Sequence, residues 1–135
     1  MSRSNKDLVR EFMATARRGD TEALRALFHP EFQVVEAESL PYGGVRRGVD
    51  GLLGLVREVF ATWQDCRVEV QQLVAEGDCV VVLAEMTGTG KSSPVPFRVP
   101  LAELYRLKDG RIIEIRPFYF DTKLLHDAHF GRAAP

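Results

Sequence analysis

An apolar strand that ends on a carboxylate is the clearest chemical feature of the chain, in the segment DGRIIEIRPFYFDT at positions 109–122. Side chains of a strand alternate between its two faces. One face of this segment therefore carries Ile113, Ile115, Pro117, Tyr119 and Asp121. A mostly apolar wall with an acid at its far end suits an enclosed pocket for a small organic molecule. Asp121 is thus a candidate for acid–base chemistry, and Tyr119 for donating a hydrogen bond to a ligand carbonyl.

Two further acids, Glu38 and Glu85, fall at strand positions. Glu38 shares parity with Glu36 on a strand expected over 32–38, and Glu85 lies in the aliphatic run VVVLAEMTGTG. Burial disfavours a charged carboxyl, so acids that meet in an apolar pocket give an acid and a base near neutrality. Such a pair supports proton abstraction next to a carbonyl, aldol-type cyclisation or water activation. The alternative for Glu85 is an ion pair with an arginine such as Arg98, or a solvent-facing position.

Hydrophobic periodicity predicts three helices in the first half of the chain. Ser4 and Asp20 are expected to cap the first two, and Asp50 the third. His29 followed by Pro30 is expected to end the second helix, because a residue before proline avoids the α region.

Alternating patterns bounded by turns then predict antiparallel strands at 67–75, 79–87, 97–107 and from 111 onward. The order of helices first and strands afterwards indicates an α+β fold, with helices packed on one face of a curved sheet.

Composition points to one globular domain over residues 1–135, with 45% hydrophobic and 27% charged residues and a net charge of −1. This balance provides no basic surface for nucleic acid. No apolar run suits a membrane span, so we expect a cytoplasmic protein without a membrane partner. His126 and His129 have a spacing that suits a metal, but residues 126–135 are predicted to be a loose, solvated tail. We therefore expect no metal and no cofactor.

Four segments carry a resemblance to a known superfamily: VREFMATARRGD, ESLPYGGVRRGVDG, VVVLAEMTGTG and DGRIIEIRPFYFDT. Together with the order of the elements, they resemble the nuclear transport factor 2-like superfamily, and within it the SnoaL-like group, over roughly residues 5 to 125. This group is related to polyketide cyclases, ketosteroid isomerases and limonene-epoxide hydrolases. The resemblance implies a cone-like, curved, mostly antiparallel sheet, with three helices from the N-terminal half packed on its concave face, enclosing a pocket. It also implies that the Glu85 face points into the cone.

Most catalytic groups of the ketosteroid isomerases are absent from the matching positions of this chain. Their tyrosine falls on Phe12, their base near Glu38 or Ser39, and their protonated acid on Ala102. Two of the three groups are missing, which argues against isomerisation by that mechanism. Phe12, Ala102 and Leu104 are instead expected to line the pocket.

The catalytic set of the epoxide hydrolases is also incomplete. Its strand carboxylate falls on or next to Glu85, and its second aspartate falls on Pro117, which becomes a pocket-lining residue. Asp121 lies further along the same face. The SnoaL-type cyclases, which employ a late aspartate as acid–base group, resemble most closely what Asp121 offers. The catalytic candidates are therefore Asp121, Glu85 and Glu38.

Two aromatic residues complete the candidate ligand site. Tyr42 in the LPYGG turn either donates a hydrogen bond to a ligand or packs at the rim with its hydroxyl in water, and the second is favoured. Trp63 is expected in the core or the pocket wall.

Two classes of protein remain open for a small hydrophobic ligand: a cofactor-free acid–base isomerase, cyclase or hydrolase, and a non-catalytic ligand-binding or dimerisation module. The last strand is apolar on both faces, so a second copy of the chain is expected to cover the outer face in a homodimer.

Overall fold

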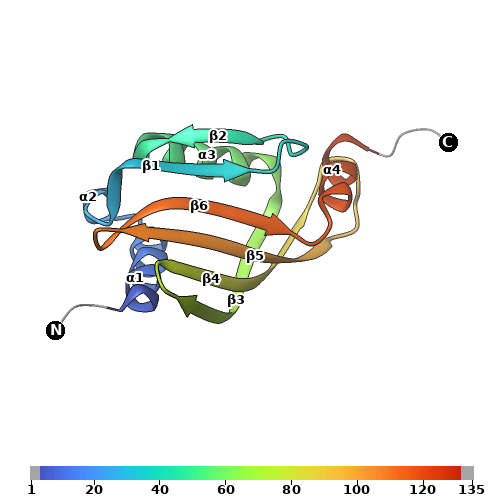
Figure 1. Ribbon diagram of the computed structural model, residues 1–135. Helices are drawn as coiled ribbons and strands as arrows, with labels where there is room; N and C mark the ends of the chain where they lie inside the picture. Colours follow the sequence, from blue (N-terminus) through green and yellow to red (C-terminus); the bar gives the residue numbers. More distant parts are fainter. Residues whose placement is uncertain (1–3, 132–135) are drawn as a thin grey trace.

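The computed structural model describes residues 4–131, which form an α+β fold as the order of elements predicted (Figure 1). Its helices are α1 (Asn5–Arg18), α2 (Thr21–Arg25), α3 (Gly48–Thr62) and α4 (Thr122–Phe130). Its strands are β1 (Phe28–Glu36), β2 (Gly44–Arg47), β3 (Gln64–Glu76), β4 (Cys79–Thr89), β5 (Phe97–Lys108) and β6 (Arg111–Tyr119). Within this described part, no helix has the length and apolar character that crossing a membrane needs.

Short polar side chains begin the first two helices, as predicted. The Ser4 hydroxyl accepts a hydrogen bond from the Asp7 N–H at 3.1 Å, and the Asp20 carboxylate accepts one from the Ala23 N–H at 3.1 Å. Gly19 ends α1 in the left-handed region, at a φ of 71°. These contacts satisfy backbone groups that the helix ends leave unpaired.

Two other predicted helix ends are wrong. α3 begins two residues before Asp50, whose carboxylate lies in the first turn and pairs with Arg25 at 2.7 Å. α2 ends at Arg25, and His29 and Pro30 belong to β1. Pro30 is tolerated there because the register of β1 on β6 shifts between residues 28 and 33, where no ladder partner needs its missing N–H.

The segment predicted as a loose tail forms most of α4. Asp121 is its N-cap and accepts a hydrogen bond from the Leu124 N–H at 3.1 Å, while Leu125 and Ala128 are buried. The expectation of a loose tail from residue 126 is therefore wrong as far as residue 130. The last four residues lie outside those that the structure describes.

The strands form one curved mixed sheet in the order β2–β1–β6–β5–β4–β3. Among the strands of residues 4–131, only β1 and β6 run parallel, and every other neighbouring pair is antiparallel. β2 begins at Gly44, the last residue of the LPYGG turn, and was not predicted as a strand. α1 and α3 lie on the same side of the sheet, and α2 packs on α1 (Figure 1). The mostly antiparallel sheet with helices on one face is thereby confirmed.

Alternation along β4 determines which side chains face the helices. The residues directed inward are all at most 3% exposed: Val80, Val82, Ala84 and Met86. Glu85 has the opposite parity, and register places it beside Pro100 on the outer face. The expectation that the Glu85 face points into the cone is therefore wrong. The run VVVLAEM is apolar at both parities, and a shift of one residue exchanges the two faces of a strand.

Candidate functional site

A cavity of about 290 Å³ lies between α3 and the inner face of the sheet. Its apolar lining comes from α1, α3 and five of the strands, and includes Phe12, Leu55, Val59, Met86, Leu101 and Pro117. The polar side chains of the lining are Glu36, Cys66, Glu103, Tyr105 and Tyr119. The structure thus places Phe12, Pro117 and Tyr119 at a mostly apolar, partly open cavity, where their contact with a ligand stays a prediction.

Glu36 is the last residue of β1 and is only 6% exposed. Its two carboxyl oxygens lie 3.0 and 3.3 Å from the Tyr119 hydroxyl. Burial raises the pKa of the Glu36 carboxyl to about 7 from its ordinary 4.5, and the nearby Glu103 adds to the rise. The Tyr119 hydroxyl and the Arg46 charge oppose it. Glu36 can therefore gain or lose a proton near neutral pH.

Glu103 lies on β5 and reaches the same cavity from the other side. Protein surrounds its carboxyl, and the side chain is accessible only in part. Burial raises the pKa of the Glu103 carboxyl to about 7, opposed by hydrogen bonding from the Tyr105 hydroxyl. Within residues 4–131, neither Glu103 nor Glu36 has a lysine or arginine at ion-pair distance. Their proximity to each other, without a cation between them, makes ionisation of both unfavourable.

Strand register explains why the two acids meet. Val34 of β1 pairs with Ile115 of β6, and continuing this register by two residues sets Glu36 beside Pro117. Pro117 in turn pairs with Glu103 of β5. The two glutamates thus flank Pro117 in one row across three strands, about 10 Å apart at their Cα atoms by ordinary strand spacing. Both side chains point toward the helices and line the same cavity.

Tyr42 is not at the rim. It is 1% exposed, and its hydroxyl accepts a hydrogen bond of 3.0 Å from Trp63 Nε1. The expectation that the Tyr42 hydroxyl lies in water is wrong, because the side chain packs edge-on against Trp63 in the core. Burial raises the pKa of Tyr42 to about 12. Trp63 lies in the core, which is one of the two positions predicted for it. Neither Tyr42 nor Trp63 lines the cavity.

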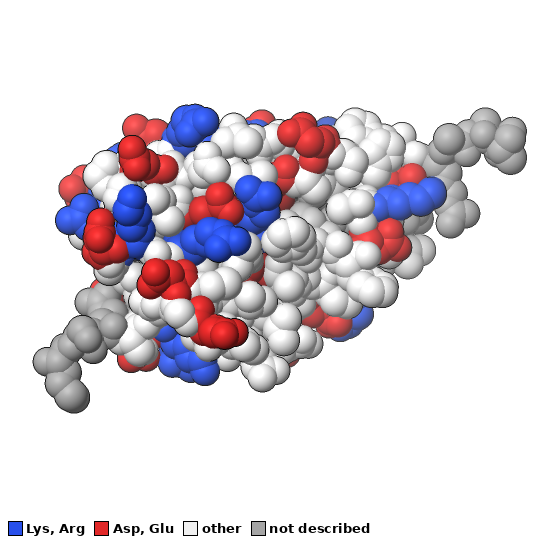
Figure 2. Space-filling model, in the orientation of Figure 1, with Lys and Arg blue, Asp and Glu red and all other residues white. Residues whose placement is uncertain are grey.

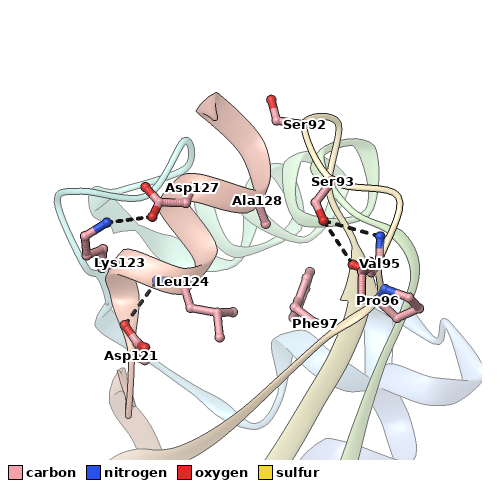
Figure 3. Close-up of a pocket in the computed structure, with 10 residues that line it drawn as sticks. All are labelled: Ser92, Ser93, Val95, Pro96, Phe97, Asp121, Lys123, Leu124, Asp127 and Ala128. Atoms are coloured by element: carbon pink, nitrogen blue, oxygen red, sulfur yellow. Dashed lines mark hydrogen bonds and ion pairs between the residues drawn. The ribbon is translucent and has the colours of Figure 1, made fainter. Parts of the chain in front are cut away.

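Asp121 lies outside the cavity. It caps α4 and faces a larger, open hollow of about 720 Å³ between α4 and the loop before β5 (Figure 3). The other charged groups there, Lys123 and Asp127, pair with each other at 2.7 Å. This hollow is open to solvent and its charged groups are engaged, so it is a poorer place for acid–base chemistry than the smaller cavity.

The remaining predicted site residues also lie elsewhere. Glu85 forms an ion pair with Arg98 on the outer face, which is the alternative that the sequence left open. Glu38 is exposed in the loop after β1. Ala102 and Leu104 are half-buried on the outer face of β5, so their expected place in the pocket lining is wrong. In each case the side chain sits one or two residues from a position that does face the cavity.

The sequence prediction chose positions one or two residues away from the two acids that line the cavity. Glu36 shares the parity of Glu38, and the end of β1 between them decides which one is enclosed. Glu103 is the neighbour of Ala102, onto which the resemblance had placed a protonated acid. The signal that was available is the alternation of Leu101, Glu103 and Tyr105, in which an acid stands between two residues that face the core.

A curved, mostly antiparallel sheet with helices on one face defines the class of cone-shaped α+β proteins. The family model of the SnoaL-like domain matches residues 9–115, and the chain belongs to the SnoaL-like family. No curated protein matches the chain.

Several solved structures share the fold. A nuclear transport factor 2-like protein from Burkholderia thailandensis is 25% identical, with a TM-score of 0.83 over 94% of this chain and 98% of that chain. A putative SnoaL-like polyketide cyclase from Jannaschia sp. CCS1 is 24% identical, with a TM-score of 0.76 over 98% and 99%. TerC, co-crystallised with polyporic acid, is 22% identical, with a TM-score of 0.76 over 92% and 96%. Likeness at these identities establishes the fold, not the reaction.

Proposed function

We propose that this protein is a cofactor-free acid–base enzyme that acts on a small hydrophobic carbonyl compound. The observation that carries the proposal is the pair Glu36 and Glu103, two carboxyls with a pKa of about 7 in one apolar cavity. A general base and a general acid work best when their pKa values lie near the operating pH. TerC, which shares the fold, was co-crystallised with polyporic acid, and this supports a small organic ligand for the present cavity as well.

The surroundings of the two acids assign their roles. The Tyr119 hydroxyl and the Arg46 charge both favour the ionised form of Glu36. Once Glu36 is ionised, its charge disfavours a second charge on Glu103. Glu36 is then the base, and Glu103 is the acid that keeps its proton.

Proton transfer between these groups defines the reaction step. The Glu36 carboxylate takes a proton from the carbon next to the substrate carbonyl, and the electron pair of that C–H bond moves to the carbonyl oxygen. The Glu103 carboxyl donates a hydrogen bond to this oxygen as negative charge develops on it. In an enone, return of the proton from Glu36 to the far carbon of the conjugated enolate completes an isomerisation. In a dicarbonyl compound, the enolate carbon attacks the second carbonyl, and the alkoxide oxygen so formed takes the proton from Glu36, which completes an aldol-type cyclisation.

The mouth of the cavity indicates a neutral, apolar substrate. Three lining residues from α3 and β3 are also open to solvent: Val56, Phe60 and Val68, at 41%, 62% and 45% exposure. An apolar rim leading to an apolar cavity favours entry of an uncharged molecule. The volume of about 290 Å³ lies at the small end of ligand sites.

A homodimer is part of the proposal. The uncovered face of the sheet carries an apolar row, Leu83, Ala102 and Phe118, across β4, β5 and β6. Figure 2 shows this face, where charged side chains gather over one end and much of the rest is uncharged. No helix of the described residues covers it, and a second copy of the chain is the occupant that this face supports. A cytoplasmic location stays a prediction from the sequence.

Hydrogen exchange at carbon tests the enzyme directly. In D₂O, a panel of cyclic ketones, enones and diketones is incubated with the protein, and mass spectrometry counts the deuterium gained next to the carbonyl. We expect the protein to speed exchange in at least one compound, and Glu36→Gln to slow it about 100-fold or more. Glu85→Gln, which removes an acid outside the cavity, is the matched control and should leave the rate unchanged. Compounds that raise the melting temperature without any exchange would contradict the enzyme and favour a non-catalytic binding module.

A further inference from the structure

Arg46 of β2 lies near Glu36 on the inner side of the sheet. The register of β2 on β1 pairs Val34 with Arg46 and Glu36 with Gly44. Val34 and Glu36 line the cavity, so the Arg46 side chain faces the helices as well, one step diagonally from Glu36. Diagonal neighbours on one face of a sheet are about 7–8 Å apart at their Cα atoms, within reach of a long side chain. Arg46 is therefore placed to form an ion pair with Glu36.

The Arg46 guanidinium lies instead against α3, where it forms an ion pair with the Glu58 carboxylate. The Arg46 side chain is 25% exposed and that of Glu58 is 50% exposed. Glu36, by contrast, has no lysine or arginine of residues 4–131 at ion-pair distance. The Arg46 charge acts on Glu36 from further away, where it opposes the rise in the pKa of that carboxyl. One arginine thus lies near two carboxyls and pairs with the one on the helix.

Close packing of α3 on β2 directs the Arg46 side chain along the helix. A Cβ at Gly51 would lie 3.2 Å from the Arg46 Cβ and 3.3 Å from its carbonyl carbon, so the missing side chain of Gly51 lets the helix lie this close to the strand. Gly51 and Glu58 are two turns apart and share one face of α3. Leu55 lies between them on that face and lines the cavity. The ion pair therefore runs along the edge of the cavity, and neither of its members belongs to the lining.

We propose that Glu58 is a positioning residue for Glu36, because it binds the Arg46 guanidinium at α3 and keeps that charge from pairing with the Glu36 carboxyl. A base held in an ion pair with arginine would be ionised at a lower pH and would take a proton from carbon less readily. Glu58 does not line the cavity, so its action on the reaction passes through Arg46. The inference rests on the proposed function in one respect, namely that Glu36 is the base.

Other titratable groups face Glu36 from the elements packed around it: Tyr119 of β6, Glu103 of β5, Cys66 of β3 and Tyr42 of the 37–43 loop. On α3, the charged residues Asp50 and Arg57 are exposed, and Asp50 pairs with Arg25. Within residues 4–131, Glu58 is the one acid at ion-pair distance from Arg46. A change at Glu58 alone therefore frees the guanidinium.

A ¹³C titration of the Glu36 carboxyl tests the inference. We expect Glu58→Gln to lower the Glu36 midpoint by about 1 pH unit, or tenfold in proton affinity, because Arg46 becomes free to pair with Glu36. Half of the Glu58 side chain is exposed, so the substitution leaves the core in place. Asp50→Asn, which removes a carboxylate from another ion pair of α3, is the matched control and should leave the midpoint unchanged. An unchanged midpoint in Glu58→Gln would overturn the proposal.

Removing Arg46 separates its role from a direct effect of the Glu58 charge. Arg46→Met should raise the Glu36 midpoint, since a nearby positive charge is lost. Adding Glu58→Gln to that variant should change the midpoint little, because Glu58 acts through Arg46. A fall of about 1 pH unit in both backgrounds would show that the Glu58 charge acts on Glu36 directly, and the positioning role would be wrong.

The pH profile of deuterium exchange links the inference to the reaction. In Glu58→Gln, the acid limb of the profile should move to lower pH by the same amount as the Glu36 midpoint. The plateau rate should fall, because a weaker base abstracts the proton more slowly.

The two proposals fail separately. A Glu36 midpoint that falls in Glu58→Gln, in a protein that exchanges no substrate hydrogen, would contradict only the enzyme. Exchange that depends on Glu36 but keeps its wild-type pH profile in Glu58→Gln would contradict only the positioning role.

Discussion

Glu36 and Glu103 are buried acids, and burial makes the ionisation of each carboxyl cost free energy of folding. In the folded protein each carboxyl has a pKa of about 7, against an ordinary value of 4.5. A carboxyl whose pKa rises on folding binds protons more tightly in the folded state. The folded protein therefore gains stability as the pH falls from about 8 toward about 4.5, and loses it as the pH rises through about 7.

Stability at two pH values tests this cost. Glu36→Gln keeps the shape of the side chain and removes the charge. We expect it to raise the free energy of unfolding at pH 8 by about 1–3 kcal/mol relative to the wild type, and to change it little at pH 5. Urea unfolding measures both. Glu85→Gln, outside the cavity, is the matched control. An equal effect of Glu36→Gln at both pH values would mean that the carboxyl carries no such cost.

Residue types were easier to predict than residue positions. The sequence predicted that acids and tyrosines would meet at an apolar wall, and the cavity has both. It selected Glu38 and Ala102 where the structure encloses Glu36 and Glu103. The reason is physical: strands such as β4 and β5 are apolar on both faces, so the pattern did not tell inside from outside, and one step of register exchanges the two.

The order and type of the longer elements followed from the sequence. α1, α3 and the four strands from β3 to β6 are long and periodic, so their own pattern specifies them. β2 and α4 are short, and their formation depends on contacts with β1 and with the core at Leu125, which a local pattern does not contain. The parallel pairing of β1 with β6 is likewise a tertiary feature.

Asp121 has a testable role in α4. As the N-cap, its carboxylate accepts a hydrogen bond from the Leu124 N–H, which would otherwise lack a partner. We expect Asp121→Ala to lower the free energy of unfolding by about 1 kcal/mol and to leave deuterium exchange into the substrate unchanged. Asp121→Asn, which retains a capping oxygen, should recover most of the stability. Loss of exchange activity in Asp121→Asn without loss of stability would instead support the catalytic role that the sequence predicted for this acid.

The whole molecule presents two unlike faces of one sheet. The inner face and the helices line the cavity, and the outer face carries Leu83, Ala102 and Phe118 in a row that no helix of residues 4–131 covers. We propose that a second copy of the chain buries this row.

The mass of the protein in solution tests whether a second copy of the chain covers this face. We expect light scattering to give twice the mass of the chain, and Phe118→Asp to return it to the mass of one chain, because a charge would be buried at the centre of the interface. Val95→Asp is the matched control, since Val95 is exposed in the loop before β5 and away from this row. A monomer in the wild type, or a dimer that survives Phe118→Asp, would contradict the proposed interface.

The central claim is that Glu36 and Glu103 form one coupled acid–base pair, and a ¹³C titration of the two carboxyls tests it most directly. The account predicts that both carboxyls of the wild-type protein titrate near pH 7, and that replacing either glutamate by glutamine lowers the midpoint of the other, since a neighbouring charge is lost. Two midpoints near 4.5 that do not respond to each other would contradict it.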